Sequence, residues 1–241
     1  GEFIFTAITA IFDGIKGFVK YGVNFDKYDW HKTTMAWKID AGMFKGNFGQ
    51  LLSKWNPWGL VNNVIGNVVS HAFNLAGTVK DVTYLEGAVA LEVAKKKNVA
   101  FTLGYYINGP RGFKADWRDH LFVHEYGHII QGNIYGPFYL STIAIPSLMD
   151  SWLEKSRHST RWYEAQASSI GGKYFNEKYG TGAKGYVPNS EFYFDINSFR
   201  NEGIPSLYSN PRNGFRNPSG YTSHFRIHWS DVGYFLVGRI L

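Results

Sequence analysis

Two histidines four residues apart constrain the fold of this chain more than any other feature. They are His124 and His128 of the segment DHLFVHEYGHIIQGN, residues 119–133. In an α-helix, residues at i and i+4 lie on one face, so both imidazoles can reach one Zn²⁺ at about 2.0–2.1 Å. Glu125 is offset by one position, where a glutamate can take a proton from water held at the metal. The segment therefore predicts a helix that supplies half of a metal site.

His120 extends this row of histidines by one turn. Three ligands at i, i+4 and i+8 of a straight helix cannot converge on one tetrahedral ion, because the outer two lie about 12 Å apart along the axis. We therefore expect His120 to line the site, to orient a ligand or to cap the helix. Gly127 costs about 1 kcal/mol relative to Ala inside a helix, which indicates close packing there. The alternative for the segment is a helix of buried, hydrogen-bonded histidines without a metal.

The third ligand must come from another segment, because a catalytic zinc site has three protein ligands and an open position. The chain has no cysteine, so this ligand is His, Asp or Glu. Glu164 is the favoured residue. Ala165, Ala167 and Ser168 follow it, and small side chains let its helix, expected around residues 160–178, approach the histidine helix closely. The alternatives, with Glu164 then on the surface, are Asp150, His158, Asp195, His224 and His228.

Other side chains are candidates for supporting roles. Ser168, one turn after Glu164, and Asp195 could accept the imidazole N–H protons. The segment YTSHFRIHW contains Tyr221, His224, Arg226 and His228, which could stabilise an oxyanion. The alternative for these residues is a polar set on an aromatic-rich surface strand.

The N-terminal part of the chain has helical periodicity. Apolar residues between Ile4 and Val19 form one stripe, and Asp13, Lys16 and Lys20 lie off it, so a membrane-spanning helix is not expected. We expect the stripe to pack against the rest of the fold, with membrane-surface contact as the alternative. Residues 44–75 predict short helices and turns.

The pattern changes after residue 80. Residues 82–93 and 98–107 are β-rich runs joined by a hairpin-like link, KKKN. Asp116 or Asp119 can cap the following helix, which is expected to run to about Gln131.

These patterns predict an α+β fold: a small antiparallel or mixed sheet packed on the histidine helix and on a second, glutamate-bearing helix. We expect a cloning remnant at residues 1–3, a helical region at 4–77 and a metal-binding domain at 78–241.

Composition limits the classes of function. The chain has 241 residues, 44% of them hydrophobic, which is enough to bury one large core or two small ones. The formal net charge is +6, but Lys and Arg are scattered, so a nucleic-acid partner is not expected.

The segment HEYGHIIQGNIYGPFYLSTIAIPSLMDS, followed by RWYEAQASSIGGKYF, resembles a known family. It is similar to the zincin-like C-terminal toxin region of bacterial Rhs-repeat polymorphic toxins, with the pattern HE[YF]GHxxQ, a GPxYL…IPSL stretch and a W-x-E helix. The resemblance covers about residues 80–200. It implies a zincin-like fold of the gluzincin type, with His124, His128 and Glu164 as zinc ligands and Glu125 as catalytic base. Where many relatives have an acidic residue, this chain has Gln166.

The resemblance also implies a biological setting. It implies a zinc metallopeptidase that is secreted or delivered by a bacterium as a toxin, with a peptide or protein substrate, an immunity protein and a delivery machinery as partners. Two other functions stay open. One is a toxin that disturbs membranes through its N-terminal region, with the metal-binding fold as scaffold. The other is a metal-binding adaptor that docks a delivery protein and catalyses nothing.

Overall fold

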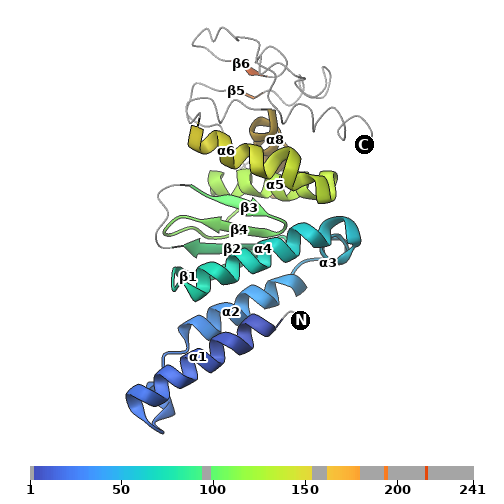
Figure 1. The fold of residues 1–241 in the computed structure, drawn as a ribbon. Coiled ribbons are helices and arrows are strands. Elements are labelled where there is room, and N and C mark those ends of the chain that lie inside the picture. The colour runs from blue at the N-terminus through green and yellow to red at the C-terminus, as the bar shows by residue number, and fades with distance from the viewer. Residues whose placement is uncertain (1–2, 94–98, 154–161, 180–192, 195–214, 217–241) are drawn as a thin grey trace. The chain divides into compact units, whose positions relative to one another are not determined.

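The computed structural model describes residues 3–93, 99–153, 162–179, 193–194 and 215–216. It combines several helices with a small four-stranded mixed sheet, which agrees with the predicted α+β class (Figure 1). The chain divides into two compact units, unit 1 (Gly1–Ala115) and unit 2 (Asp116–Leu241).

Unit 1 contains four helices and the four-stranded sheet. They are α1 (Ile4–Tyr21), α2 (His31–Ala41), α3 (Phe48–Trp55), α4 (Pro57–Leu75), β1 (Val79–Leu85), β2 (Ala88–Val93), β3 (Phe101–Leu103) and β4 (Tyr106–Gly109). The described elements of unit 2 are α5 (His120–Tyr135), α6 (Ile145–Leu153), α8 (Trp162–Tyr179), β5 (Tyr193–Phe194) and β6 (Phe215–Arg216). Short 3-10 turns lie at Phe25–Lys27, Gly42–Phe44 and Gly136–Phe138, and a π-helical turn at Leu140–Ala144.

Side-chain caps set the starts of α3 and α4. Asn47 and Gln50 form a reciprocal capping box at the start of α3. The Asn56 side chain accepts the Gly59 N–H at the start of α4, and Pro57 occupies the first turn, where a missing N–H costs nothing. Residues 44–75, predicted as short helices and turns, therefore hold one short helix and one helix of 19 residues.

The sheet has the strand order β1-β2-β4-β3 (Figure 1). β1 and β2 are antiparallel, as are β3 and β4, whereas β2 and β4 are parallel. The predicted hairpin between the two β-rich runs is therefore wrong, because each run folds into a hairpin of its own. Gly87 and Gly104 permit this, since both have left-handed backbones, with φ of 75° and 57°, at the turns within the runs.

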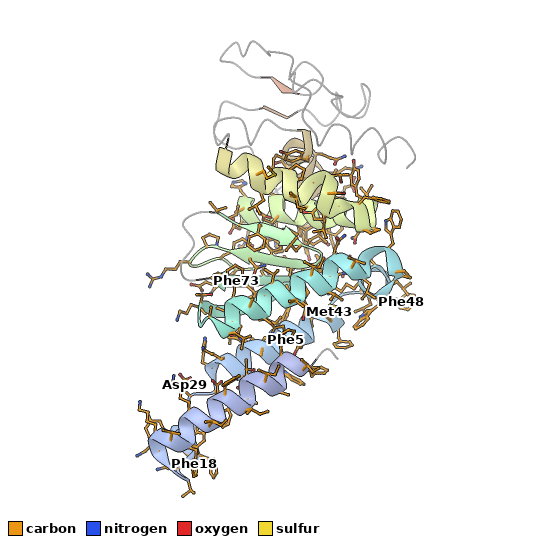
Figure 2. The ribbon with its side chains drawn as sticks, in the orientation of Figure 1. Phe5, Phe18, Asp29, Met43, Phe48 and Phe73 are labelled. Atoms are coloured by element: carbon orange, nitrogen blue, oxygen red, sulfur yellow. The ribbon has the colours of Figure 1, made fainter. Side chains whose placement is uncertain are left out.

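One core joins the sheet to the N-terminal helices. Its residues are Met35, Ile39, Met43, Val79, Val82, Val89, Leu91, Val93 and Tyr106. Met43 and the partly buried Phe73, which packs against this core, are labelled in Figure 2. α2, the turn that follows it and strands β1, β2 and β4 bury these apolar side chains against one another. The division into compact units falls after Ala115, and the sequence suggested a domain boundary after residue 77.

The apolar stripe of α1 does not pack inward, so that expectation is wrong. Ile11, Phe12 and Val19 are 62%, 63% and 81% exposed, and α1 buries Thr9 and Asp13 instead. The Asp13 carboxylate accepts hydrogen bonds from the backbone N–H and hydroxyl of Thr33. Polar contacts thus direct the polar face of α1 toward α2. None of the helices in the described part of the chain is long and apolar enough to cross a membrane.

Lys54 joins three parts of unit 1. Its side chain is fully buried, and Nζ donates to the carbonyl oxygens of Gly42, Lys45 and Gly87 at 2.7 Å each. Burial lowers the pKa of Lys54 to about 7. The three carbonyls oppose this shift, because only the ammonium form has three N–H donors. The contacts tie α3 to the end of α2 and to the β1–β2 turn.

Replacing this buried amine should therefore destabilise unit 1. Lys54→Met leaves three carbonyl oxygens without their donor, and we expect a loss of about 3 kcal/mol in the free energy of unfolding, measured by urea denaturation. Lys27→Met is the matched control, since Lys27 is exposed, and should change stability by less than about 0.5 kcal/mol. Equal stabilities of the two variants would contradict the role of Lys54.

Candidate metal centre

The first two expected ligands lie on α5 in unit 2. The Asp119 side chain accepts the Leu121 N–H at 2.8 Å, so one of the two predicted caps begins this helix. The helix continues past Gln131, its predicted end, to Tyr135. Gly136 then takes φ of 55°, a left-handed value that suits glycine at a helix end.

Two glycines allow the backbones of α5 and α8 to touch. A Cβ on Gly127 would lie 1.9 Å from the Ala167 carbonyl oxygen, and a Cβ on Gly171 would lie 2.1 Å from that of Val123. Neither obstacle is a side chain that could rotate away. The close packing expected at Gly127 is therefore present. It lets side chains of the two helices reach one another across the interface.

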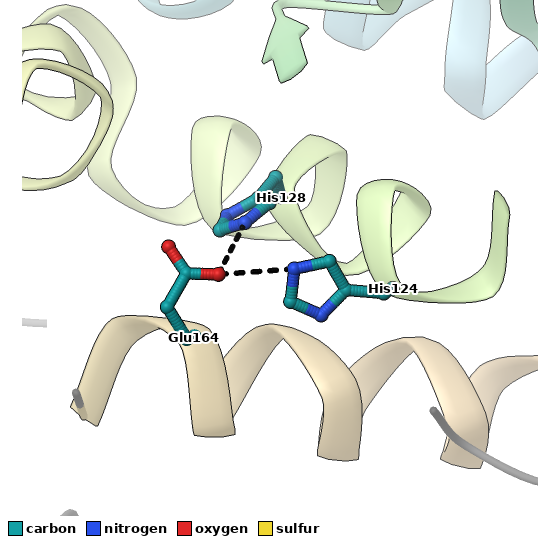
Figure 3. Close-up of side chains that lie close together, drawn as sticks. All are labelled: His124, His128 and Glu164. Carbon is teal, nitrogen blue, oxygen red and sulfur yellow. Dashed lines mark ion pairs between the residues drawn. The ribbon is translucent and has the colours of Figure 1, made fainter. Parts of the chain in front are cut away.

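His124, His128 and Glu164 meet in this interface (Figure 3). Oε2 of Glu164 lies 3.0 Å from Nε2 of His124 and 3.4 Å from Nε2 of His128. The three groups could hold a metal ion, because their donor atoms all lie within 4.8 Å of one another. Ligand atoms about 2.1 Å from a tetrahedral ion stand about 3.4 Å apart, so the two measured separations fit such an ion.

Ser168 orients the His124 ring. Nδ1 of His124 lies 2.9 Å from the Ser168 hydroxyl, which in turn lies 3.1 Å from the Glu164 carbonyl oxygen. The carbonyl can only accept, so the hydroxyl donates to it and accepts the imidazole N–H. This arrangement places the proton on Nδ1 and leaves the Nε2 lone pair facing Glu164. Ser168 thus has the ring-orienting contact expected from the sequence.

Gln131 orients the His128 ring in the same way. Nε2 of Gln131 donates to the Tyr163 carbonyl at 2.7 Å and to Oε1 of Gln166 at 2.8 Å. These bonds fix the amide, so its oxygen accepts Nδ1–H of His128 at 2.7 Å. Gln166 therefore helps to orient the His128 ring through Gln131.

Glu164 has a partner of its own. The Ser147 hydroxyl, on α6, donates to Oε1 at 2.6 Å, while Oε2 faces the two histidines. The side chain of Glu164 is only 3% exposed. A carboxylate with one oxygen held by a hydroxyl and the other directed at two imidazoles is preorganised to bind a cation.

Charge in this buried site changes the pKa of two neighbours. Burial lowers the pKa of His128, but the carboxylate of Glu164, with smaller contributions from Glu125 and Gln131, outweighs burial and raises it to about 9. Burial raises the pKa of Tyr139 well above its usual value, and the charges of Glu125 and Glu164 add to that shift. Tyr139 therefore keeps its proton and can act as a donor near the two carboxylates.

Of the remaining candidates, the structure describes only His120. His120 is exposed at the first turn of α5 and is not one of the three clustered groups, as the helical spacing predicted. Outside the described residues lie His158, Asp195, Tyr221, His224, Arg226 and His228, together with the side chain of Asp150.

Four contributing residues were not identified as such from the sequence. Gln131 and Gln166 fix His128, Ser147 holds Glu164, and Gly171 matches Gly127 across the interface. The sequence could have identified Gln131, because it lies one turn after His128 and can reach back to its ring. No pattern in the sequence indicates that Ser147 contacts a residue 17 positions later.

No protein-family model, curated protein or solved structure matches this chain. The geometry of this cluster and the motif that carries it are therefore the features that indicate a function.

The contact at Gly127 can be tested by adding one methyl group. Gly127→Ala forces a Cβ against the Ala167 carbonyl, so we expect unit 2 to lose about 2 kcal/mol of stability and metal binding to weaken about 10–100-fold, measured by calorimetric titration with Zn²⁺. Gly132→Ala is the control on the same helix. A Cβ there would meet only Tyr139, at 3.9 Å, so the variant should bind as tightly as the original and gain helix propensity. Equal loss in both variants would refute the close-contact interpretation.

The raised pKa of His128 predicts a pH dependence. The pKa rises from 6.5 to about 9 on folding, so the protonated form stabilises the metal-free protein below pH 6.5, and this stabilisation is lost as the pH rises through about 9. Metal binding needs the neutral ring, so affinity should increase with pH over the same window and binding should release a proton.

Calorimetry in buffers of different ionisation enthalpy measures that proton release. The reference is His120→Gln, which changes an exposed histidine on the same helix and should leave the release unchanged. Metal affinity that does not change between pH 6.5 and 9 would count against this assignment.

Proposed function

We propose that this chain is a zinc-dependent hydrolase of peptide bonds. The observation that carries the proposal is the convergence of His124, His128 and Glu164, with both imidazole Nε2 atoms directed at one carboxylate oxygen. Two imidazoles and one carboxylate suit Zn²⁺ better than Mg²⁺ or Ca²⁺, which prefer oxygen ligands alone. Three protein ligands, with a further coordination position open, are the usual set of a catalytic zinc site.

The position of Glu125 supports catalysis over simple metal storage. It is adjacent to His124, it is only 4% exposed, and its charge contributes to the raised pKa of His128. Bound Zn²⁺ would supply Lewis acidity, polarising the substrate carbonyl and lowering the pKa of water to about 7. Glu125 takes a proton from the attacking water and returns it to the leaving amine as the C–N bond breaks, so the carboxylate is regenerated.

Other residues of the site assist the same steps. The hydrogen bonds of Ser168 and Gln131 hold the two rings with Nε2 inward, so neither ring needs to turn when an ion binds. Burial keeps Tyr139 protonated, and the charges of Glu125 and Glu164 add to that effect. His124, with 12% of its side chain exposed, is the most accessible of the three ligands.

The motif resemblance supports a more specific proposal. The pattern HEYGHIIQ, followed by the glutamate helix, fits the zincin-like toxin regions of Rhs-repeat proteins. On this proposal the protein is delivered from a bacterium and cleaves a protein of its target, and an immunity protein protects the producer.

Removing one carboxylate separates metal binding from catalysis. Glu125→Gln keeps all three ligands, so the variant should retain zinc, measured by elemental analysis. It should lose peptide hydrolysis about 10²–10⁴-fold, measured against a peptide library, and with it toxicity in target cells. Glu177→Gln, an exposed glutamate on α8, is the control and should keep full activity. A fully active Glu125→Gln variant would disprove this mechanism.

A further inference from the structure

Two helices of unit 1, α1 and α4, bury polar side chains and expose apolar ones. α4 buries a polar row, Asn62, Asn63, Asn67, Ser70, His71 and Asn74. Its larger exposed hydrophobic residues are Val61, Val64, Val68 and Leu75, together with Trp58 in the first turn. α1 follows the same rule, with Thr9 and Asp13 inside and its apolar stripe outside. Exposed apolar residues are common singly, but a continuous stripe marks an interaction surface.

A hydrogen-bonded network joins polar side chains of α1, α2 and α4. Asp40 and His71 are fully buried, and Nε2 of His71 lies 2.7 Å from Oδ1 of Asp40, while the Thr6 hydroxyl donates to Oδ2. Asn67 donates to the Tyr106 hydroxyl at 2.9 Å. Helices that pair polar groups with one another and turn apolar groups outward are organised for contact with lipid.

Aromatic residues extend the apolar surface beside the start of α1. The Phe3 ring stacks on Trp37 at 5.3 Å and on Phe44 at 6.2 Å, and Phe44 contacts Trp55 at 5.5 Å. All four residues are exposed, and their rings come from separate segments of the chain. Phe18 lies at the opposite end of α1, away from the sheet (Figure 2). We call the α1 stripe together with these four residues the apolar surface.

On α1 itself the exposed charge is positive, and the exposed Asp26 and Asp29 lie in the segment that follows it. The exposed charged residues within α1 are Lys16 and Lys20, because Asp13 is buried. Lys16 and Lys32 also line a hollow of about 440 Å³, whose apolar lining includes Phe12, Ile15 and Leu75. Lysines next to apolar side chains match the anionic headgroups and acyl chains of a lipid surface. A second copy of the chain, paired through α1, would instead place the lysines of the two copies close together, where like charges repel.

We propose that the apolar surface of unit 1 binds an anionic lipid bilayer, with α1 lying in the plane where headgroups meet acyl chains. α1 is not long and apolar enough to span the bilayer, which agrees with an interfacial position. This inference is independent of the metal centre, which lies in unit 2.

Vesicle flotation with the full chain tests the proposal. Vesicles of phosphatidylglycerol and phosphatidylcholine should bind the protein, phosphatidylcholine alone should bind it more weakly, and salt should reduce the difference. Ile15→Gln with Val19→Gln changes two side chains that are already exposed, so folding should persist and binding should fall at least about tenfold. Lys16→Gln should weaken binding to anionic vesicles about fivefold.

Two controls separate the outcomes. Val99→Gln replaces an exposed valine outside the apolar surface and should bind vesicles as the original chain does. Glu125→Gln should also bind normally, so that failure of the peptidase proposal leaves this one standing. The proposal is overturned if the original chain does not float with anionic vesicles, or if the stripe variant binds equally well. It is also overturned if the stripe variant only dissolves a self-association seen without lipid.

Discussion

The candidate metal centre depends on the distance between two helix backbones. Carbonyl oxygens of α5 and α8 occupy the positions where Gly127 and Gly171 would otherwise carry a Cβ. At that separation a glutamate side chain from one helix reaches two histidine side chains of the other, and no loop or ordered water is required. The site is therefore a property of helix packing, which makes it rigid, since buried backbones move little against each other.

Helix packing also explains why each ligand has a second contact. A side chain held in an interface this tight loses most of its rotamers, and its remaining polar atom must find a partner there. Ser168 and Gln131 form hydrogen bonds with the two rings, and Ser147 donates one to the carboxylate. The partners face the outer atoms of the ligands, so the inner atoms stay directed at one point. Orientation of the ligands thus follows from satisfying buried polar groups.

Local patterns in the sequence predicted much of this site. The histidine spacing, the Asp119 cap, the glycine between the ligands and the small residues after Glu164 each act within one or two helical turns. What could not be predicted depends on contacts between distant segments. The parallel pairing of β2 with β4 is one case, and the bond from Ser147 to Glu164 is another. Periodicity found the two faces of α1 but could not say which face lies inside, because that depends on the polar partners that α2 offers.

Both units bury polar side chains, but the contacts of these side chains differ between the units. In unit 2 the largely buried side chains of His124, His128 and Glu164 direct their polar atoms at one point, where they could hold a metal ion. In unit 1 the buried groups compensate one another, as Asp40 and His71 do, and their apolar neighbours remain outside. These contacts hold the polar sides of α1 and α4 inside, so the apolar sides of both helices face outward. Apolar area exposed to water raises the free energy of the protein, and a lipid surface that covers this area removes that cost.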